Sequence, residues 1–379
     1  QEALWLAQEL GDQQRELRVW LALTNLYNLG SDPAWRQSGQ RALELARQLG
    51  AQHAEVDALL LLAGGYGLDN LEQARGYYEQ ALQIAQRWED KAAELTVLAI
   101  ARTPLIWEGD YYRALVEYER KQLQLSRAIG NRYAEGHSLM SCGQFQGLWL
   151  GDLATGIALE EESLQILENL TSRIYALLRL AQLQILMGQL EEAQATIQRA
   201  RPVSEEEVRE LGRAGLRLVE ALLYNALGDK LQLVQVFEAV SSVHQMVQNG
   251  LVSRQYDMAA CCEETAAHLQ LIPLSERAEE RVEHQQAALW TSQVALEIYE
   301  QFGFVQIVEC TSEELFYRRF QALQANGRDA EATEYLQRAH AEMMRKHDLI
   351  PEDSHFRQTY LENLPLHRQI QAAFSQTTR

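Results

Sequence analysis

Hydrophobic residues recur at three- and four-residue spacing along almost the whole chain, with polar residues between them. This period is that of an α-helix with one buried face. Only six prolines interrupt 379 residues, and no long segment alternates apolar and polar residues as a half-exposed strand would. The one strand-like phrase, FVQIVEC at 304–310, is interpreted as a helix–helix connection or the start of a helix. The pattern therefore predicts an all-α protein.

A nine-residue block recurs along the first half of the chain. It reads ALWLAQELG from Ala3, ALELARQLG from Ala42, ALQIAQRWE from Ala81, QLQLSRAIG from Gln122 and SLQILENLT from Ser163. Successive copies start 39 to 41 residues apart. Self-similarity at a fixed period of this size indicates that one helical unit is stacked many times.

A second landmark separates the two helices of each unit. It has Gly or Asp at a short turn and a small residue five positions later, as in EGDYYRALVEY from Glu108. The small residues are Ala74, Ala114, Gly156, Ala193 and Ala332, and the larger residues four positions further on are Tyr78, Tyr118, Ile197 and Leu336. Glycine can close a helix in the left-handed conformation, and a small side chain lets two helices approach closely. Each unit is therefore predicted to be a helical hairpin.

These units resemble the tetratricopeptide repeat (TPR), although their period is about 40 residues instead of the usual ~34. The resemblance implies a right-handed superhelical solenoid of about eight hairpins, in which the first helix of each hairpin, helix A, lines a concave groove. It weakens after Leu227, where Leu233 replaces the small residue. We divide the chain into TPR-like repeats at 1–250, a divergent helical region at 251–311, a last TPR-like hairpin at 312–347 and a C-terminal capping segment at 348–379.

The segment HDLIPEDSHFRQTYLENLPLHRQIQAAF at 347–374 is similar to the ending that closes TPR-type arrays in large bacterial multidomain regulators. The residues that carry this similarity are Arg357, Tyr360, Leu361, Asn363, Pro365, Arg368 and Ile370. In such regulators the array follows a nucleotide-binding STAND module, a signalling ATPase. The resemblance implies that this chain is an excerpt of such a protein, and that its tail is a capping helix covering the last hairpin.

Net charge, apolar runs and cysteine content limit the possible partners and the location of the protein. The formal net charge is −19, and such a field disfavours nucleic acid as a partner. No apolar run approaches the roughly 20 residues that span a bilayer, so no membrane partner is expected. The four cysteines form no CxxC pair and are too few for a disulfide scaffold, which favours a reducing, cytoplasmic location.

The sequence contains no recognisable catalytic or cofactor motif. It lacks the GxxxxGK[ST], GxGxxG, HExxH and GxSxG patterns, so we expect this segment to be no enzyme, with no cofactor and no metal site. The glycines of AGGYG at 63–67 are interpreted as a close helix crossing. His340, His347 and His355 are spaced too widely for a zinc pair and are interpreted as surface residues.

Candidate ligand-binding residues follow from the positions of helix A that should face the groove. They are Trp20, Tyr27, Tyr66, Arg102, Trp107, Gln144, Phe145, Trp149 and Gln182. For the tryptophans the alternative is core packing, and for Arg102 it is an ion pair with a neighbouring acid. The Thr103-Pro104 pair should interrupt helix A beside Arg102.

Two functions fit these patterns. The first is a sensor arm that binds a protein, a peptide or a small effector in its groove and thereby regulates an upstream NTPase domain of the same chain. The second is a free-standing scaffold that holds two proteins together without a switch. The identity of the ligand does not follow from the repeat, because repeat arrays present one framework to many ligands.

Overall fold

The computed structural model describes residues 2–29, 32–67, 70–206, 210–303 and 310–377. Every regular element among these residues is a helix, which confirms the all-α prediction. The strand-like phrase at 304–310 lies, apart from its last residue, outside the described residues. The chain divides into two compact units, the first formed by 1–107 with 116–134 and the second by 108–115 with 135–379. The divisions at 250, 311 and 347 mark changes in repeat register and stay predictions.

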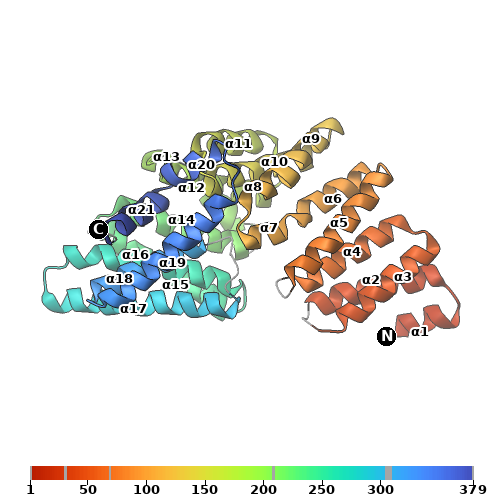
Figure 1. Cartoon of the computed structure of the whole chain (residues 1–379), viewed down its shortest axis with the longest axis horizontal. Coiled ribbons are helices and arrows are strands. Elements are labelled where there is room, and N and C mark those ends of the chain that lie inside the picture. The colour runs from red at the N-terminus through yellow and green to blue at the C-terminus, as the bar shows by residue number, and fades with distance from the viewer. Residues whose placement is uncertain (1, 30–31, 68–69, 207–209, 304–309, 378–379) are drawn as a thin grey trace. The chain divides into compact units, whose positions relative to one another are not determined.

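The first unit contains helices that pack on their neighbours in the sequence (Figure 1). They are α1 (Glu2–Glu9), α2 (Gln13–Leu29), α3 (Trp35–Leu49), α4 (Gln52–Tyr66), α5 (Leu71–Arg87), α6 (Lys91–Ala101), most of α7 (Thr103–Glu108) and α9 (Arg120–Ala128). The predicted interruption at Thr103-Pro104 is confirmed, because α6 ends at Ala101 and α7 begins at Thr103. The nine-residue blocks form the ends of second helices, such as α3 and α5.

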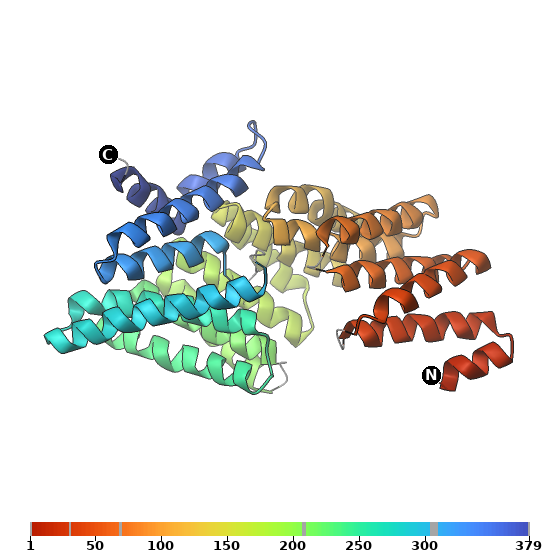
Figure 2. The same ribbon diagram turned by 60° about the horizontal axis from the view of Figure 1, so that its bottom comes forward.

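The second unit continues the same alternation, and its successive hairpins stack side by side (Figure 2). Its helices are α8 (Tyr111–Arg113), α10 (Arg132–Gly143), the π-helix η2 (Gln144–Trp149), α11 (Leu153–Ile166), α12 (Leu170–Leu186), α13 (Leu190–Glu206), α14 (Glu210–Leu227), α15 (Lys230–Gln248), α16 (Arg254–Leu274), α17 (Ala278–Gln301), α18 (Ser312–Ala325), α19 (Asp329–Asp348), α20 (Phe356–Glu362) and α21 (Pro365–Thr377). A further π-helix, η1 (Ala114–Glu119), joins α8 to α9 and spans the boundary between the units.

Several hairpin turns use a glycine followed by a capping aspartate. Gly151 adopts a φ of 78°, the left-handed conformation that ends a helix without a steric penalty. The next residue, Asp152, accepts a hydrogen bond from the backbone N–H of Thr155 at the start of α11. Gly109 and Asp110 repeat this arrangement at the start of α8. The landmark therefore encodes a helix stop and a helix start in two adjacent residues.

The small residues of the landmark are buried, as a position between two packed helices requires. They are Ala74, Ala114, Gly156, Ala193 and Ala332. Gly156 of α11 packs against Gly147 of η2 so tightly that a Cβ atom on Gly156 would lie 2.7 Å from the Gly147 Cα. Contact between the two backbones is therefore possible only with glycine at these positions.

The weak repeat register after Leu227 has a structural explanation. Leu233, in place of the small residue, is fully buried in α15, so a larger side chain fills the same position. The following helices are also longer, since α16 has 21 residues and α17 has 24, whereas α12 and α13 have 17 each. These helices still form a hairpin, but the hairpin is longer than the repeat period of about 40 residues seen in the first half of the chain.

The C-terminal tail closes the second unit on itself. Helix α21 packs on α19 of the last hairpin, where the predicted cap would lie. The tail also reaches residues more than 200 positions earlier: Thr359 Oγ1 donates to the Leu150 carbonyl at 2.7 Å, and Asn363 Nδ2 donates to the Gly151 carbonyl at 2.9 Å. In Figure 1, α20 accordingly lies beside α11. The tail therefore joins the last helices of the second unit to the turn before α11.

This closure predicts different costs for alanine at two glycines with the same φ of 78°. A Cβ atom on Gly151 would lie 2.2 Å from the Thr359 carbonyl oxygen of the tail, whereas a Cβ atom on Gly188 would meet nothing within 4 Å. We expect Gly188→Ala to lower the free energy of unfolding by about 1–2 kcal/mol through backbone strain alone. Gly151→Ala should lose about 1–3 kcal/mol more through overpacking.

Urea denaturation measures both costs, and hydrogen exchange over 356–377 shows whether the tail opens. Faster exchange in Gly151→Ala but not in Gly188→Ala is expected. Equal stability and equal exchange in the two variants would show that the tail does not close on the Gly151 turn.

Candidate functional site

The second unit contains a partly open chamber of about 810 Å³. Its walls are the first helices of successive hairpins, α12, α14, α16 and α18, together with η2 and the start of α21. Those four helices also pack consecutively on one another. Among the described lining residues, none comes from the second helices α11, α13, α15, α17 and α19. The chamber lining in this unit is therefore formed by the first helices of the hairpins.

The first helices can line the chamber because each is apolar on more than one side. In α14, Ala214 and Ala221 pack in the core between hairpins, whereas Leu218, Leu222 and Asn225 face the chamber at four- and three-residue spacing. The repeat pattern thus supplies one face for stacking and a second face for a cavity.

Three of the predicted binding residues line the chamber: Gln144, Trp149 and Gln182. Trp149 stacks on Tyr111 with ring centroids 4.8 Å apart, so its indole is fixed in the wall. Phe145 is 1% exposed and packs edge-on against Trp149, behind the lining. Gln144, Phe145 and Trp149 all belong to η2, and π-helical turns occur frequently at functional sites.

The other predicted residues belong to the first unit, where they make local contacts. The Trp20 indole N–H donates to Glu16, and Tyr27 is half-buried on the same helix. Tyr66 packs edge-on against Trp35 with centroids 4.9 Å apart.

Arg102 forms an ion pair with Glu119, whose carboxylate is fully buried. The predicted alternative for Arg102, an ion pair with a neighbouring acid, is therefore confirmed. Trp107 is half-buried at the end of the first unit. Gln144 and Trp149 lie in the second unit. The side-by-side stacking of Trp107 with Trp149 and of Arg102 with Gln144 stays a prediction.

One end of the chamber is polar. Asn225 Nδ2 donates to Glu263 Oε2 at 2.6 Å, and Arg318 Nη2 donates to Glu314 Oε1 at 3.2 Å. Burial raises the pKa of Glu263 to about 7, and the negative charge of Glu314 adds to this effect, while Arg318 and the Asn225 hydrogen bond oppose it. These groups offer a ligand both a hydrogen-bonding carboxyl group and a guanidinium within one wall.

Two free cysteines lie in the same wall. The sulfur atoms of Cys262 and Cys310 are 3.5 Å apart. The hydrogen bond to Cys262 and burial raise the pKa of the Cys310 thiol well above its usual range. Cys310 is therefore protonated at neutral pH and contributes an apolar, weakly hydrogen-bonding surface.

The tail that closes the chamber is held by a buried ionic network. Glu313 of α18 accepts hydrogen bonds from Lys346 of α19 and from His367 of α21, the latter at 3.3 Å. His367 Nδ1 donates to the Tyr360 carbonyl at 2.6 Å. Burial alone would raise the pKa of Glu313, but Lys346 and His367 outweigh it and hold that pKa well below the usual value. The lining residue His367 is therefore fixed by ion pairing and not by apolar contact alone.

His347, next to Lys346 in the sequence, is buried as well, which corrects the interpretation of His347 as a surface residue.

This network predicts a pH-dependent stability. A group whose pKa is lowered by folding contributes stability that is fully present above its unfolded value, 4.5 for Glu313, and is lost as the pH falls below it. We expect Glu313→Gln to lower the free energy of unfolding by about 3–5 kcal/mol at neutral pH, because it leaves Lys346 buried without a counter-ion. The difference from wild type should shrink below pH 4.5.

Urea denaturation over a pH series measures this difference, and Glu334→Gln, an exposed position on α19, serves as the matched control. A difference that stays constant from neutral pH to well below pH 4.5 would contradict the assigned charge of Glu313.

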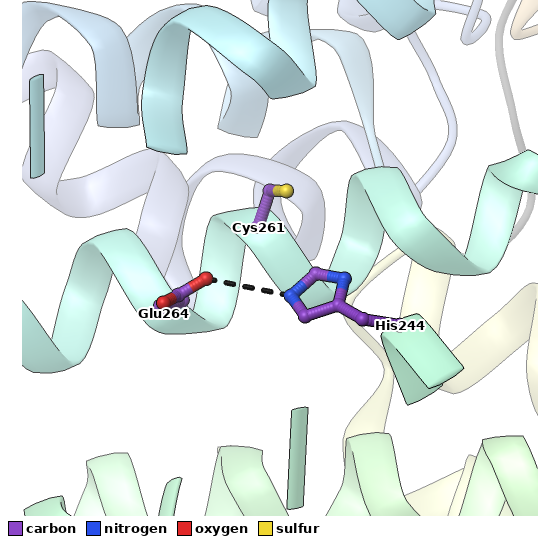
Figure 3. Close-up of side chains that lie close together, drawn as sticks. All are labelled: His244, Cys261 and Glu264. Carbon is purple, nitrogen blue, oxygen red and sulfur yellow. Dashed lines mark hydrogen bonds and ion pairs between the residues drawn. The ribbon is translucent and has the colours of Figure 1, made fainter. Parts of the chain in front are cut away.

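A second cluster of polar side chains lies outside the chamber, between α15 and α16 (Figure 3). It contains His244 of α15 with Cys261 and Glu264 of α16, whose donor atoms lie within 4.8 Å of one another. His244 Nε2 is 3.4 Å from Glu264 Oε2, and its Nδ1 hydrogen-bonds Asp257. These two carboxylates raise the pKa of His244 to about 9. Burial raises the pKa of the Cys261 thiol above its usual range.

Sequence reasoning missed this cluster and most of the chamber. His244 is 17 positions from Cys261, so no short ligand motif joins them. The signal that could have found it is the i, i+4, i+7 spacing of Asp257, Cys261 and Glu264, which places all three on one face of a helix.

Comparison with known proteins assigns no family. No protein-family model matches the chain, and no curated protein matches it significantly in sequence. Among the described helices, none has the length and apolar character needed to cross a bilayer.

Proposed function

We propose that this chain is a non-enzymatic binding module that senses a small effector or a short peptide segment in the chamber of its second unit. The single observation that carries the proposal is the chamber itself, which is lined by the first helices and has a volume of about 810 Å³. Sites for small molecules typically measure about 300–1,000 Å³. A folded protein domain would not fit inside such a volume.

The chemistry of the wall supports the same conclusion. Apolar side chains such as Leu218 and Leu222 make up one part of the wall, and a few polar groups, among them Glu263 and Arg318, converge at another. Binding pockets usually combine an apolar surface, which supplies affinity, with a small number of fixed polar groups, which orient the ligand.

The larger context of this module rests on the sequence resemblances. A TPR-like, right-handed array with the C-terminal ending of bacterial multidomain regulators fits the sensor arm of a cytoplasmic STAND-type signalling ATPase. Ligand in the chamber would favour one arrangement of the hairpins, and the upstream NTPase would respond to that arrangement. The alternative remains a free-standing scaffold for protein assembly. A P-loop in the polypeptide upstream of Gln1 would favour the sensor.

The proposal predicts that filling the chamber abolishes ligand binding without unfolding the protein. Gln182 is half-buried on α12 and lines the chamber, whereas Gln198 of α13 is exposed. Gln182→Trp should therefore occupy part of the ligand volume, and Gln198→Trp adds the same side chain outside it.

Affinity-selection mass spectrometry against libraries of small metabolites and of short peptides is the measurement. We expect compounds that wild type and Gln198→Trp retain and that Gln182→Trp loses, with all three proteins equally helical by circular dichroism. If Gln182→Trp retained every compound that wild type retains, ligands would bind elsewhere and the chamber would not be the site.

A further inference from the structure

We propose that His244, Cys261 and Glu264 form a zinc-binding site between α15 and α16. The three side chains converge from two helices, with the His244 ring pointing toward the Glu264 carboxylate and the Cys261 sulfur beside both (Figure 3). This site is independent of the chamber and of the function proposed for it.

The sequence CCEE at 261–264 separates two faces of α16. Cys262 and Glu263 face the chamber, whereas Cys261 and Glu264 belong to the cluster with His244. Residues three and four positions apart lie on the same side of a helix, so Cys261 and Glu264 present their donor atoms together. His244 of the preceding helix supplies the third donor.

The geometry fits a tetrahedral ion. With zinc–nitrogen and zinc–oxygen distances of about 2.0–2.2 Å, two ligand atoms at neighbouring tetrahedral corners lie roughly 3.4 Å apart. The distance between His244 Nε2 and Glu264 Oε2 is 3.4 Å. All three donor atoms, the sulfur included, lie within 4.8 Å, so small side-chain rotations suffice to surround one ion. A water molecule would take the fourth position.

Asp257 orients the His244 ring through the nitrogen that does not face the metal site. It hydrogen-bonds His244 Nδ1, which directs the opposite nitrogen, Nε2, toward Cys261 and Glu264. Metal-binding histidines commonly donate their second ring N–H to a carboxylate, because this contact fixes the ring and increases its basicity. The His244 and Glu264 side chains are 26% and 21% exposed, so an ion can reach them from solvent.

The donor set selects zinc over the harder cations. Magnesium and calcium prefer oxygen ligands only, whereas zinc binds thiolate, imidazole and carboxylate together. In the metal-free protein a proton lies between His244 and Glu264, and Cys261 carries its thiol proton. Zinc replaces both protons, which pass to solvent, and the ion takes the place of the ion pair between the helices.

Cobalt titration of the full, chelator-treated chain tests the site. Co²⁺ in a tetrahedral site with a thiolate ligand gives a sulfur-to-cobalt charge-transfer band in the near ultraviolet and intense d–d bands in the visible. We expect both in wild type, and their loss on adding Zn²⁺, which binds more tightly than Co²⁺. Absence of the bands in wild type would overturn the proposal.

The adjacent residues provide matched controls. Cys261→Ser should lose the charge-transfer band, whereas Cys262→Ser should keep it; Glu264→Gln should weaken binding, whereas Glu263→Gln should not. Asp257→Asn should keep the band but weaken cobalt binding by about 10–100-fold. Loss of the band in Cys262→Ser with retention in Cys261→Ser would assign the metal to the chamber wall and overturn this site.

X-ray absorption at the zinc edge of the wild-type protein with zinc added identifies the metal ligands without any variant. One sulfur ligand together with nitrogen or oxygen ligands is expected, and a first shell without sulfur would contradict the proposal.

Discussion

The second unit depends on one buried ionic contact, that of Glu313 with Lys346 and His367. These three residues come from α18, α19 and α21, and Lys346 also lies over the ring of Tyr111 in α8, 5.7 Å from its centroid. The network therefore joins α18, α19 and α21 to α8, the first helix of the same unit. Ion burial is costly, and the cost is offset only when the partners are well placed. Here one carboxylate meets two donors, so the contact specifies where the tail must lie.

The chamber is a consequence of that closure. A stack of hairpins with apolar first helices would expose Leu218, Leu222 and their equivalents along an open groove. With α21 held across the stack, the same residues become the wall of a partly open chamber. Leu364, 6% exposed, anchors the start of the tail helix at this wall. Ligand access and tail position are thus linked, because moving α21 would change the chamber that its first turn lines.

Helix α16 shows how one element serves several purposes. Ala260 and Ala267 pack in the core with α14 and α15, Cys262 and Glu263 face the chamber, and Cys261 with Glu264 meets His244. One helix can present these three sets of residues on different faces because successive residues project at about 100° intervals. This division also explains why α16 lacks a strong amphipathic pattern and why its repeat signature is weak.

The sequence determined the local structure of this protein. The Gly-Asp landmarks, the small residues and the three-to-four spacing act over a few residues, so they predicted the hairpins, the break at Thr103-Pro104 and the close approach at Gly156. Of the nine candidate binding residues, Gln144, Trp149 and Gln182 line the chamber. The contacts of Thr359 with Leu150, and of His244 with Cys261, were decided only by the tertiary structure. The Thr359 contact depends on the accumulated rotation of many hairpins, which no short-range pattern in a single sequence encodes. The His244 contact depends on how α15 packs on α16, so the spacing within α16 indicates only the half of the cluster that lies on that helix.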